Sequence, residues 1–108
     1  MPKQSENQVE SEIVKWLMAR DWIVDRNNVG MFYTITGEPV RIGRVGQCDW
    51  RAARRRGYLE FEAKATGKTP SKEQREYIAK RNYQGIPCTW ADSLSMFERW
   101  YSLHGFCD

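Results

Sequence analysis

The sequence has few of the residues on which several common kinds of site depend. It contains one histidine, His104, and three cysteines, Cys48, Cys88 and Cys107, no two of which form a CxxC pair. Zinc fingers and HExxH metalloproteases require more histidines or closely spaced cysteines, so both classes are excluded. Scattered cysteines in odd number also argue against a disulfide framework, and we expect a protein of the reducing cytoplasm.

Long apolar stretches are missing as well. No run approaches the roughly 18 apolar residues that a membrane helix needs, and the polar stretch from Pro2 to Glu6 lacks the apolar region of a signal peptide. Hydrophobic residues still make up 41% of the 108 residues, which is enough for a packed core. We therefore expect no membrane association and a single domain over residues 1–108.

Basic residues are concentrated in one part of the chain, although the formal net charge is only +3. The segment from Arg41 to Arg56 holds six arginines and one acid, Asp49. A charge run of this kind is, by itself, typical of a solvated hairpin tip. Beside an acidic site it favours contact with nucleic-acid phosphates. The candidate phosphate contacts are Arg44, Arg51, Arg54, Arg55, Arg56 and Lys68.

Two capping boxes predict where helices begin. Ser5 with Gln8 opens a helix to about residue 20, and Ser71 with Gln74 opens another to about residue 84. A third helix is expected to start at Asp92 or Ser93 and to end at Gly105. In the first helix the apolar residues that recur at helical spacing, and so predict the buried stripe, are Val9, Ile13, Trp16 and Leu17.

The remaining segments predict a sheet. Strands are expected over residues 22–26, 47–52, 58–65 and 86–91, with a further extended stretch over residues 31–36. The strand over 86–91 should lie parallel to that over 58–65, because a helix connects them. We expect an α/β fold in which a mixed sheet is flanked by helices, in the order α-β-β-β-α-β-α.

Acidic side chains from distant segments are predicted to meet on this sheet. Side chains alternate along the strand over residues 58–65, so Leu59, Phe61 and Ala63 are expected to form its apolar face. Glu60, Glu62 and Lys64 point together to the opposite face. Asp49 belongs to the strand before, and Glu10 lies on the inner side of the first helix. Converging carboxylates bind Mg²⁺ or Mn²⁺, and a lysine beside them can contact a water or a phosphate oxygen. The combination predicts a metal-dependent nuclease, although each motif alone is common.

The order of these motifs, from Glu10 to about Trp90, resembles the PD-(D/E)xK nuclease superfamily and, more narrowly, its VRR-NUC family. Asp49 matches the aspartate of the family's Gly-x-Pro-Asp segment, but Cys48 stands where proline is usual. The family's Glu-x-Lys corresponds to residues 62–64, and its Ser-x-x-Gln to residues 71–74.

The resemblance implies a restriction-endonuclease-like fold and a Mg²⁺- or Mn²⁺-dependent endodeoxyribonuclease. Asp49, Glu62 and the Ala63 carbonyl would bind the metal. Glu10 would bind a second metal or a water on it, and Lys64 would contact the attacking water or a phosphate oxygen. Gln74 either touches the site or only caps its helix. Glu6 and Glu12 remain open as alternatives to Glu10.

It also implies a homodimer acting on branched DNA such as Holliday junctions, because one site per chain requires two copies to cut two strands. Minimal family members are often phage-encoded, which places the protein in a bacterial cytoplasm or nucleoid. No base-reading motif is visible, so recognition of DNA shape is favoured over recognition of sequence. Two alternatives stay open: a non-catalytic nucleic-acid-binding module using the arginine-rich hairpin, and an interaction domain using its tryptophans.

Overall fold

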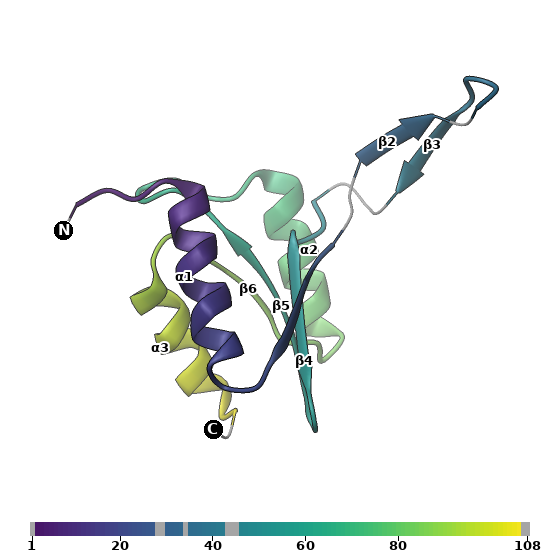
Figure 1. Cartoon of the computed structure of the whole chain (residues 1–108). Coiled ribbons are helices and arrows are strands. Elements are labelled where there is room, and N and C mark those ends of the chain that lie inside the picture. Colours follow the sequence, from purple (N-terminus) through teal and green to yellow (C-terminus); the bar gives the residue numbers. More distant parts are fainter. Residues whose placement is uncertain (1, 28–29, 34, 43–45, 107–108) are drawn as a thin grey trace.

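A computed structural model describes residues 2–27, 30–33, 35–42 and 46–106. The described chain begins with a helix, continues through five consecutive strands, and ends with a helix, a strand and a helix (Figure 1). Their bounds are α1 (Glu6–Met18), β1 (Ile23–Arg26), β2 (Gly30–Tyr33), β3 (Pro39–Ile42), β4 (Trp50–Arg54), β5 (Gly57–Ala63), α2 (Lys72–Tyr83), β6 (Cys88–Ala91) and α3 (Leu94–His104). None of the helices within these described ranges has the length and apolar character needed to cross a membrane.

Four strands form a mixed sheet in the order β1-β4-β5-β6. The pairs β1–β4 and β4–β5 are antiparallel, whereas β5 and β6 are parallel. Parallel neighbours need a crossover connection, and α2 provides it. The helices α1 and α3 lie on one face of the sheet and α2 lies on the other (Figure 1). The prediction of an α/β fold with a mixed sheet between helices is therefore confirmed.

The hydrophobic core lies between the sheet and the helices α1 and α3. The face of β5 predicted to be apolar, Leu59, Phe61 and Ala63, is fully buried there. It packs against the predicted stripe of α1 and against Phe97 and Tyr101 of α3. Full burial of one large apolar side chain stabilises a fold by about 1.5–3 kcal/mol. This layer therefore supplies most of the hydrophobic stabilisation and fixes β5 in the middle of the domain.

The opposite layer is polar. No residue of α2 is buried, yet the helix covers Glu60 and Glu62, which are 3% and 2% exposed. Glu60 accepts four hydrogen bonds: from Arg81 Nε at 2.9 Å and Nη2 at 3.0 Å, from the Tyr77 hydroxyl at 3.0 Å, and from the Tyr58 hydroxyl at 2.7 Å. Burial alone would raise the pKa of Glu60, but these hydrogen bonds outweigh it and lower the pKa.

The helix starts follow the sequence signals. Both capping boxes are formed, with the Ser5 and Ser71 hydroxyls accepting from the Gln8 and Gln74 amides. Ser93 caps α3, and Gly105 ends it at a φ of 78°, a left-handed conformation that glycine adopts without strain.

Two strand predictions were wrong. Five strands, rather than three, precede α2, because residues 30–42 form two strands joined by a turn. This β2–β3 hairpin is a separate two-stranded sheet that projects away from the main body (Figure 1). The second error concerns Asp49, which precedes β4 rather than lying within it, because its amide donates to the Glu62 side chain instead of joining the strand ladder.

The hydrogen bonds at Glu60 generate a stability prediction. Arg81→Ala removes the main partner of a buried carboxylate, so we expect the free energy of unfolding to fall by about 2–3 kcal/mol. Arg75→Ala removes an arginine from the exposed side of the same helix and should change it by less than about 0.5 kcal/mol. Urea unfolding of both variants at neutral pH measures the difference. Equal losses in the two variants would contradict the anchoring role of Arg81.

Candidate active site

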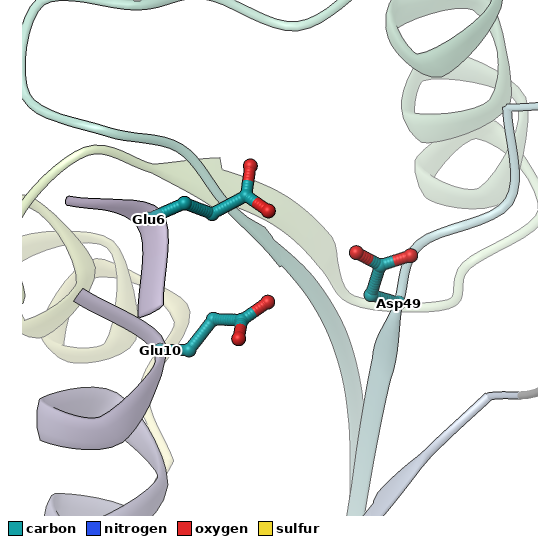
Figure 2. Close-up of side chains that lie close together, drawn as sticks. All are labelled: Glu6, Glu10 and Asp49. Atoms are coloured by element: carbon teal, nitrogen blue, oxygen red, sulfur yellow. The ribbon is translucent and has the colours of Figure 1, made fainter. Parts of the chain in front are cut away.

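Acidic side chains gather at the edge of the sheet where β4 begins and β5 ends. Glu6 and Glu10 lie one turn apart at the start of α1, so their side chains share a helix face. Both point toward Asp49, which comes from the segment just before β4 (Figure 2). Carboxylate oxygens of the three residues lie within 4.8 Å of one another. Glu10 is only 6% exposed, whereas Glu6 is exposed.

Glu62 connects this cluster to α2 and to the predicted lysine. The Asp49 amide donates to Glu62 Oε2 at 3.2 Å, and the Gln74 side-chain amide donates to Glu62 Oε1. Lys64 Nζ lies 3.9 Å from the same Oε1. The five side chains predicted from the sequence to form the site (Glu10, Asp49, Glu62, Lys64 and Gln74) are thus joined by direct contacts or short distances.

The Glu62 carboxyl is held in an environment that favours its protonated form. Burial, together with the charge and hydrogen bonding of the Asp49 carboxylate, raises the pKa of Glu62 to about 8. The Asp49 amide and the Lys64 ammonium act in the opposite direction but do not offset these effects. Like-charged carboxylates that share a site commonly show a raised pKa in one partner, and a bound cation relieves the repulsion.

The Ala63 carbonyl faces the same edge of the sheet. The amides of Glu60 and Lys64 donate toward β6, to the carbonyls of Pro87 and Ala91 at 2.9 Å each. Backbone groups of successive strand residues point in opposite directions within the sheet plane, so Ala63 directs its carbonyl toward the β4 side. β4 begins only at Trp50, opposite Phe61, so this carbonyl lies beyond the end of β4, on the side from which Asp49 comes.

The segment that carries Asp49 is fixed on both sides. Gly46 has a φ of +82°, and a Cβ there would collide with the Glu73 carbonyl of α2, so this close approach requires glycine. The backbone amide of Asn27 donates to the Asp49 carbonyl at 2.6 Å, and the side-chain amide of Asn27 donates to the Cys48 carbonyl at 3.0 Å.

Cys48, just before Asp49, contributes packing. Its Sγ lies 3.3 Å from the Sγ of Cys88 at the start of β6, and both side chains are buried. The hydrogen bond with Cys88 and burial raise the pKa of the Cys48 thiol, so the thiol stays protonated at neutral pH.

Arg26 is a member of the site that the sequence analysis missed. Its Nη2 lies 3.3 Å and 3.2 Å from the two carboxylate oxygens of Glu10. Arg26 pairs with Trp50 across the β1–β4 ladder, and its guanidinium lies 4.8 Å from the centre of the Trp50 ring. The side chain is 54% exposed, so its contact with Glu10 is open to solvent. The packing of β1 beside α1 and the pairing of β1 with β4 place Arg26 here, and no local motif signals it.

The structure also bears on the alternatives to Glu10. Glu6 joins the cluster, so both acidic residues at the start of α1 reach Asp49. Glu12 is instead engaged by the side-chain amide of Gln4. The general preference for acids in the first turn of a helix was the only sequence signal for Glu6.

The arginine run does not surround the acidic cluster. Arg55 and Arg56 form the turn between β4 and β5, at the opposite end of β4 from Asp49. Arg54 donates to the Arg20 carbonyl at 2.9 Å and lies 4.6 Å from the centre of the Trp22 ring.

The other proposed phosphate contacts are spread over different parts of the domain. Arg51 is exposed on the α2 face of β4, opposite Glu60. Lys68 is exposed in the loop that follows β5, at the end of the sheet where the acidic cluster lies. Arg44 lies outside the described residues.

The donor set fits a hard divalent cation. Three carboxylates offer oxygens close enough to converge, Glu62 contacts Asp49, and a carbonyl faces the same edge. Oxygen ligands of this kind suit Mg²⁺ and Mn²⁺. The first turn of α1 brings Glu6 to Asp49, and the first turn of α2 brings Gln74 to Glu62. The positive end of a helix dipole favours carboxylates and phosphates.

Comparison with protein-family models, with curated proteins and with solved structures finds no match for this chain.

The raised pKa of Glu62 predicts an unusual dependence of stability on pH. Between its ordinary value of 4.5 and about 8, the folded protein binds a proton that the unfolded chain releases. In EDTA, the free energy of unfolding should therefore fall as pH rises through this range. Glu62→Gln should remove the decline and be more stable than the unmodified protein at pH 8, by on the order of 2 kcal/mol.

Urea unfolding of both proteins between about pH 5 and 8 tests this expectation. Glu60, whose pKa is lowered, contributes stability that is lost as pH falls, but it is present in both proteins and cancels in the comparison. Parallel pH profiles for the two proteins would show that Glu62 ionises normally.

Proposed function

We propose that this chain is a metal-dependent endodeoxyribonuclease of the PD-(D/E)xK type, closest in its motif order to the VRR-NUC family. The observation that carries the proposal is the convergence of Asp49 and Gln74, from separate parts of the sequence, on Glu62. Lys64, two residues further along the chain, lies beside the same carboxylate. The mixed sheet, with α1 before it and α2 crossing from β5 to β6, is compatible with a restriction-endonuclease-like core.

The roles of the residues follow from their positions. Asp49 and Glu62, with the Ala63 carbonyl, would hold one divalent cation, and Glu6 and Glu10 would complete its surroundings or hold a second. A cation bound there would neutralise the scissile phosphate and lower the pKa of the attacking water. Lys64, half-buried beside Glu62, is placed to orient that water or to contact a phosphate oxygen. Gln74 keeps the Glu62 carboxylate in position.

We further propose branched DNA, such as a four-way junction, as the substrate and a homodimer as the active form. A chain with one such cluster cuts two strands symmetrically only as a pair related by a twofold axis. The motif order supports this assignment and, with it, a location in a bacterial cytoplasm or nucleoid.

Cleavage assays test the proposal directly. Labelled linear, flap and four-way DNA are incubated with Mg²⁺, with Mn²⁺ and with EDTA. Asp49→Asn and Lys64→Ala should each lower the rate about 100-fold or more while leaving DNA binding largely intact. Lys15→Ala, an exposed change on the outer side of α1, is the matched control and should cleave normally. Tight DNA binding without cleavage in any metal would favour the non-catalytic binding module instead.

Arg26 generates a separate prediction about metal binding. Its guanidinium occupies both oxygens of Glu10, so a cation has to compete with it. Arg26→Ala should bind Mn²⁺ about two- to fivefold more tightly, because an exposed ion pair of this kind is worth at most about 1 kcal/mol. The same variant should cleave DNA more slowly. In the unmodified protein, a cation that binds Glu10 would release the Arg26 guanidinium to contact the phosphate, and the variant lacks this contact.

Titration calorimetry with Mn²⁺ in the absence of DNA measures the affinity. Arg55→Ala removes the same charge at the far end of β4 and is the control for long-range electrostatics. Equal Mn²⁺ affinities in Arg26→Ala, Arg55→Ala and the unmodified protein would show that Arg26 does not compete for Glu10.

A further inference from the structure

A cleft of about 800 Å³ opens between the sheet and α2. Residues from the sheet side, among them Arg51 and Tyr58, form one wall, and Tyr77, Lys80 and Gln84 of α2 and its C-cap form the other. Sites that bind small ligands have volumes of about 300–1,000 Å³. The cleft can therefore admit a short extended segment of a polymer, but it is too small to enclose a double helix.

The charge in the cleft is positive and only partly compensated. At the base of the cleft, the charge of Arg81 is neutralised by an ion pair with Glu60. Arg51 and Lys80 are exposed, and in the described part of the chain neither forms an ion pair with a carboxylate. Two cations on opposite walls of a cleft favour an anionic ligand that passes between them.

Two aromatic rings in the same cleft have fixed positions. The hydroxyls of Tyr58 and Tyr77 both donate to Glu60, at 2.7 Å and 3.0 Å. Burial and the contact with Glu60 raise the pKa of Tyr58 to about 12, so its hydroxyl remains a donor at neutral pH. Rings that are held at one end by a hydrogen bond offer preorganised surfaces for a planar group, and nucleic-acid bases stack on such surfaces.

The cleft adjoins the acidic cluster. Asn27 and Gln47 line it, and Asn27 also holds the Asp49 carbonyl. On β5, Glu60 at the base of the cleft and Glu62, which contacts Asp49 of the acidic cluster, are two residues apart on one strand face. That separation is about 7 Å, comparable to the length of one nucleotide unit.

We propose that this cleft binds an unpaired stretch of nucleic-acid strand next to the phosphodiester bond that the acidic cluster cleaves. Arg51 and Lys80 contact its phosphates, and Tyr58 and Tyr77 contact its bases. The proposal rests on the nuclease function and deepens it, because it assigns a single-stranded segment of the substrate to a defined surface. A branched substrate offers unpaired nucleotides of this kind where its duplex arms meet.

Binding of a short fluorescent single strand in EDTA tests the proposal without any cleavage. The double variant Arg51→Ala/Lys80→Ala should bind about tenfold more weakly, and its salt dependence should be reduced by a slope of about 1.4, which corresponds to two lost phosphate contacts. The matched control is Lys15→Ala/Arg99→Ala, which removes two exposed charges from α1 and α3 on the other side of the sheet. It should bind nearly as well as the unmodified protein.

The outcomes separate this proposal from the nuclease proposal. Asp49→Asn should lose cleavage and keep single-strand binding, because the cleft is intact in that variant. Equal binding by the two double variants, or no single-strand binding at low salt, would overturn the cleft assignment whether or not the protein cleaves DNA. If Arg51→Ala/Lys80→Ala lost as much affinity for a blunt duplex as for the single strand, the preference for an unpaired strand would be overturned. Circular dichroism confirms folding, and the single variants Arg51→Gln and Lys80→Gln provide a second test.

Discussion

The structure depends on how two adjacent buried glutamates of β5 are compensated. Taking a carboxylate out of water costs several kcal/mol unless hydrogen bonds or charges replace the lost hydration. Glu60 receives four hydrogen bonds and remains ionised. Glu62 receives two, beside a second carboxylate, and retains a proton up to about pH 8. The first glutamate therefore serves as an anchor, and the second is left ready to exchange its proton for another cation.

The helix α2 serves both glutamates. Gln74 and Arg81 lie seven residues apart, which is about two helical turns, so they point to the same side of α2 and reach Glu62 and Glu60 respectively. Since no residue of α2 is buried, these polar contacts, rather than hydrophobic burial, determine where the helix sits. The anchor and the candidate site are thus set by one helix on one strand. A change that loosens α2 would disturb the surroundings of Glu62 even though the hydrophobic core between α1, α3 and the sheet is untouched.

Features encoded by local patterns could be predicted from the sequence. The alternation along β5 correctly divided Leu59 and Phe61 from Glu60 and Glu62, and hydrogen-bonding side chains at fixed spacing located the starts of α1 and α2. Features that depend on pairing between distant segments could not be predicted. Arg26 reaches Glu10 because β1 pairs with β4 and packs beside α1, and Asp49 leaves the strand because Glu62 accepts a hydrogen bond from its amide. The arginine-rich stretch looked adjacent to Asp49 in sequence, but β4 carries Arg55 and Arg56 to its other end.

The β2–β3 hairpin has a consequence of its own. Each of its strands pairs only with the other among the described strands, so the outer edge of each keeps backbone amides and carbonyls directed away from the ribbon. Such edges can extend the sheet of a second polypeptide, and a two-stranded ribbon has dimensions that the major groove of DNA accommodates. The hairpin projects from the body (Figure 1), so a ligand bound to it would be tethered to the domain. Tethering would raise the effective concentration of that ligand at the rest of the surface without any new contact at the acidic edge.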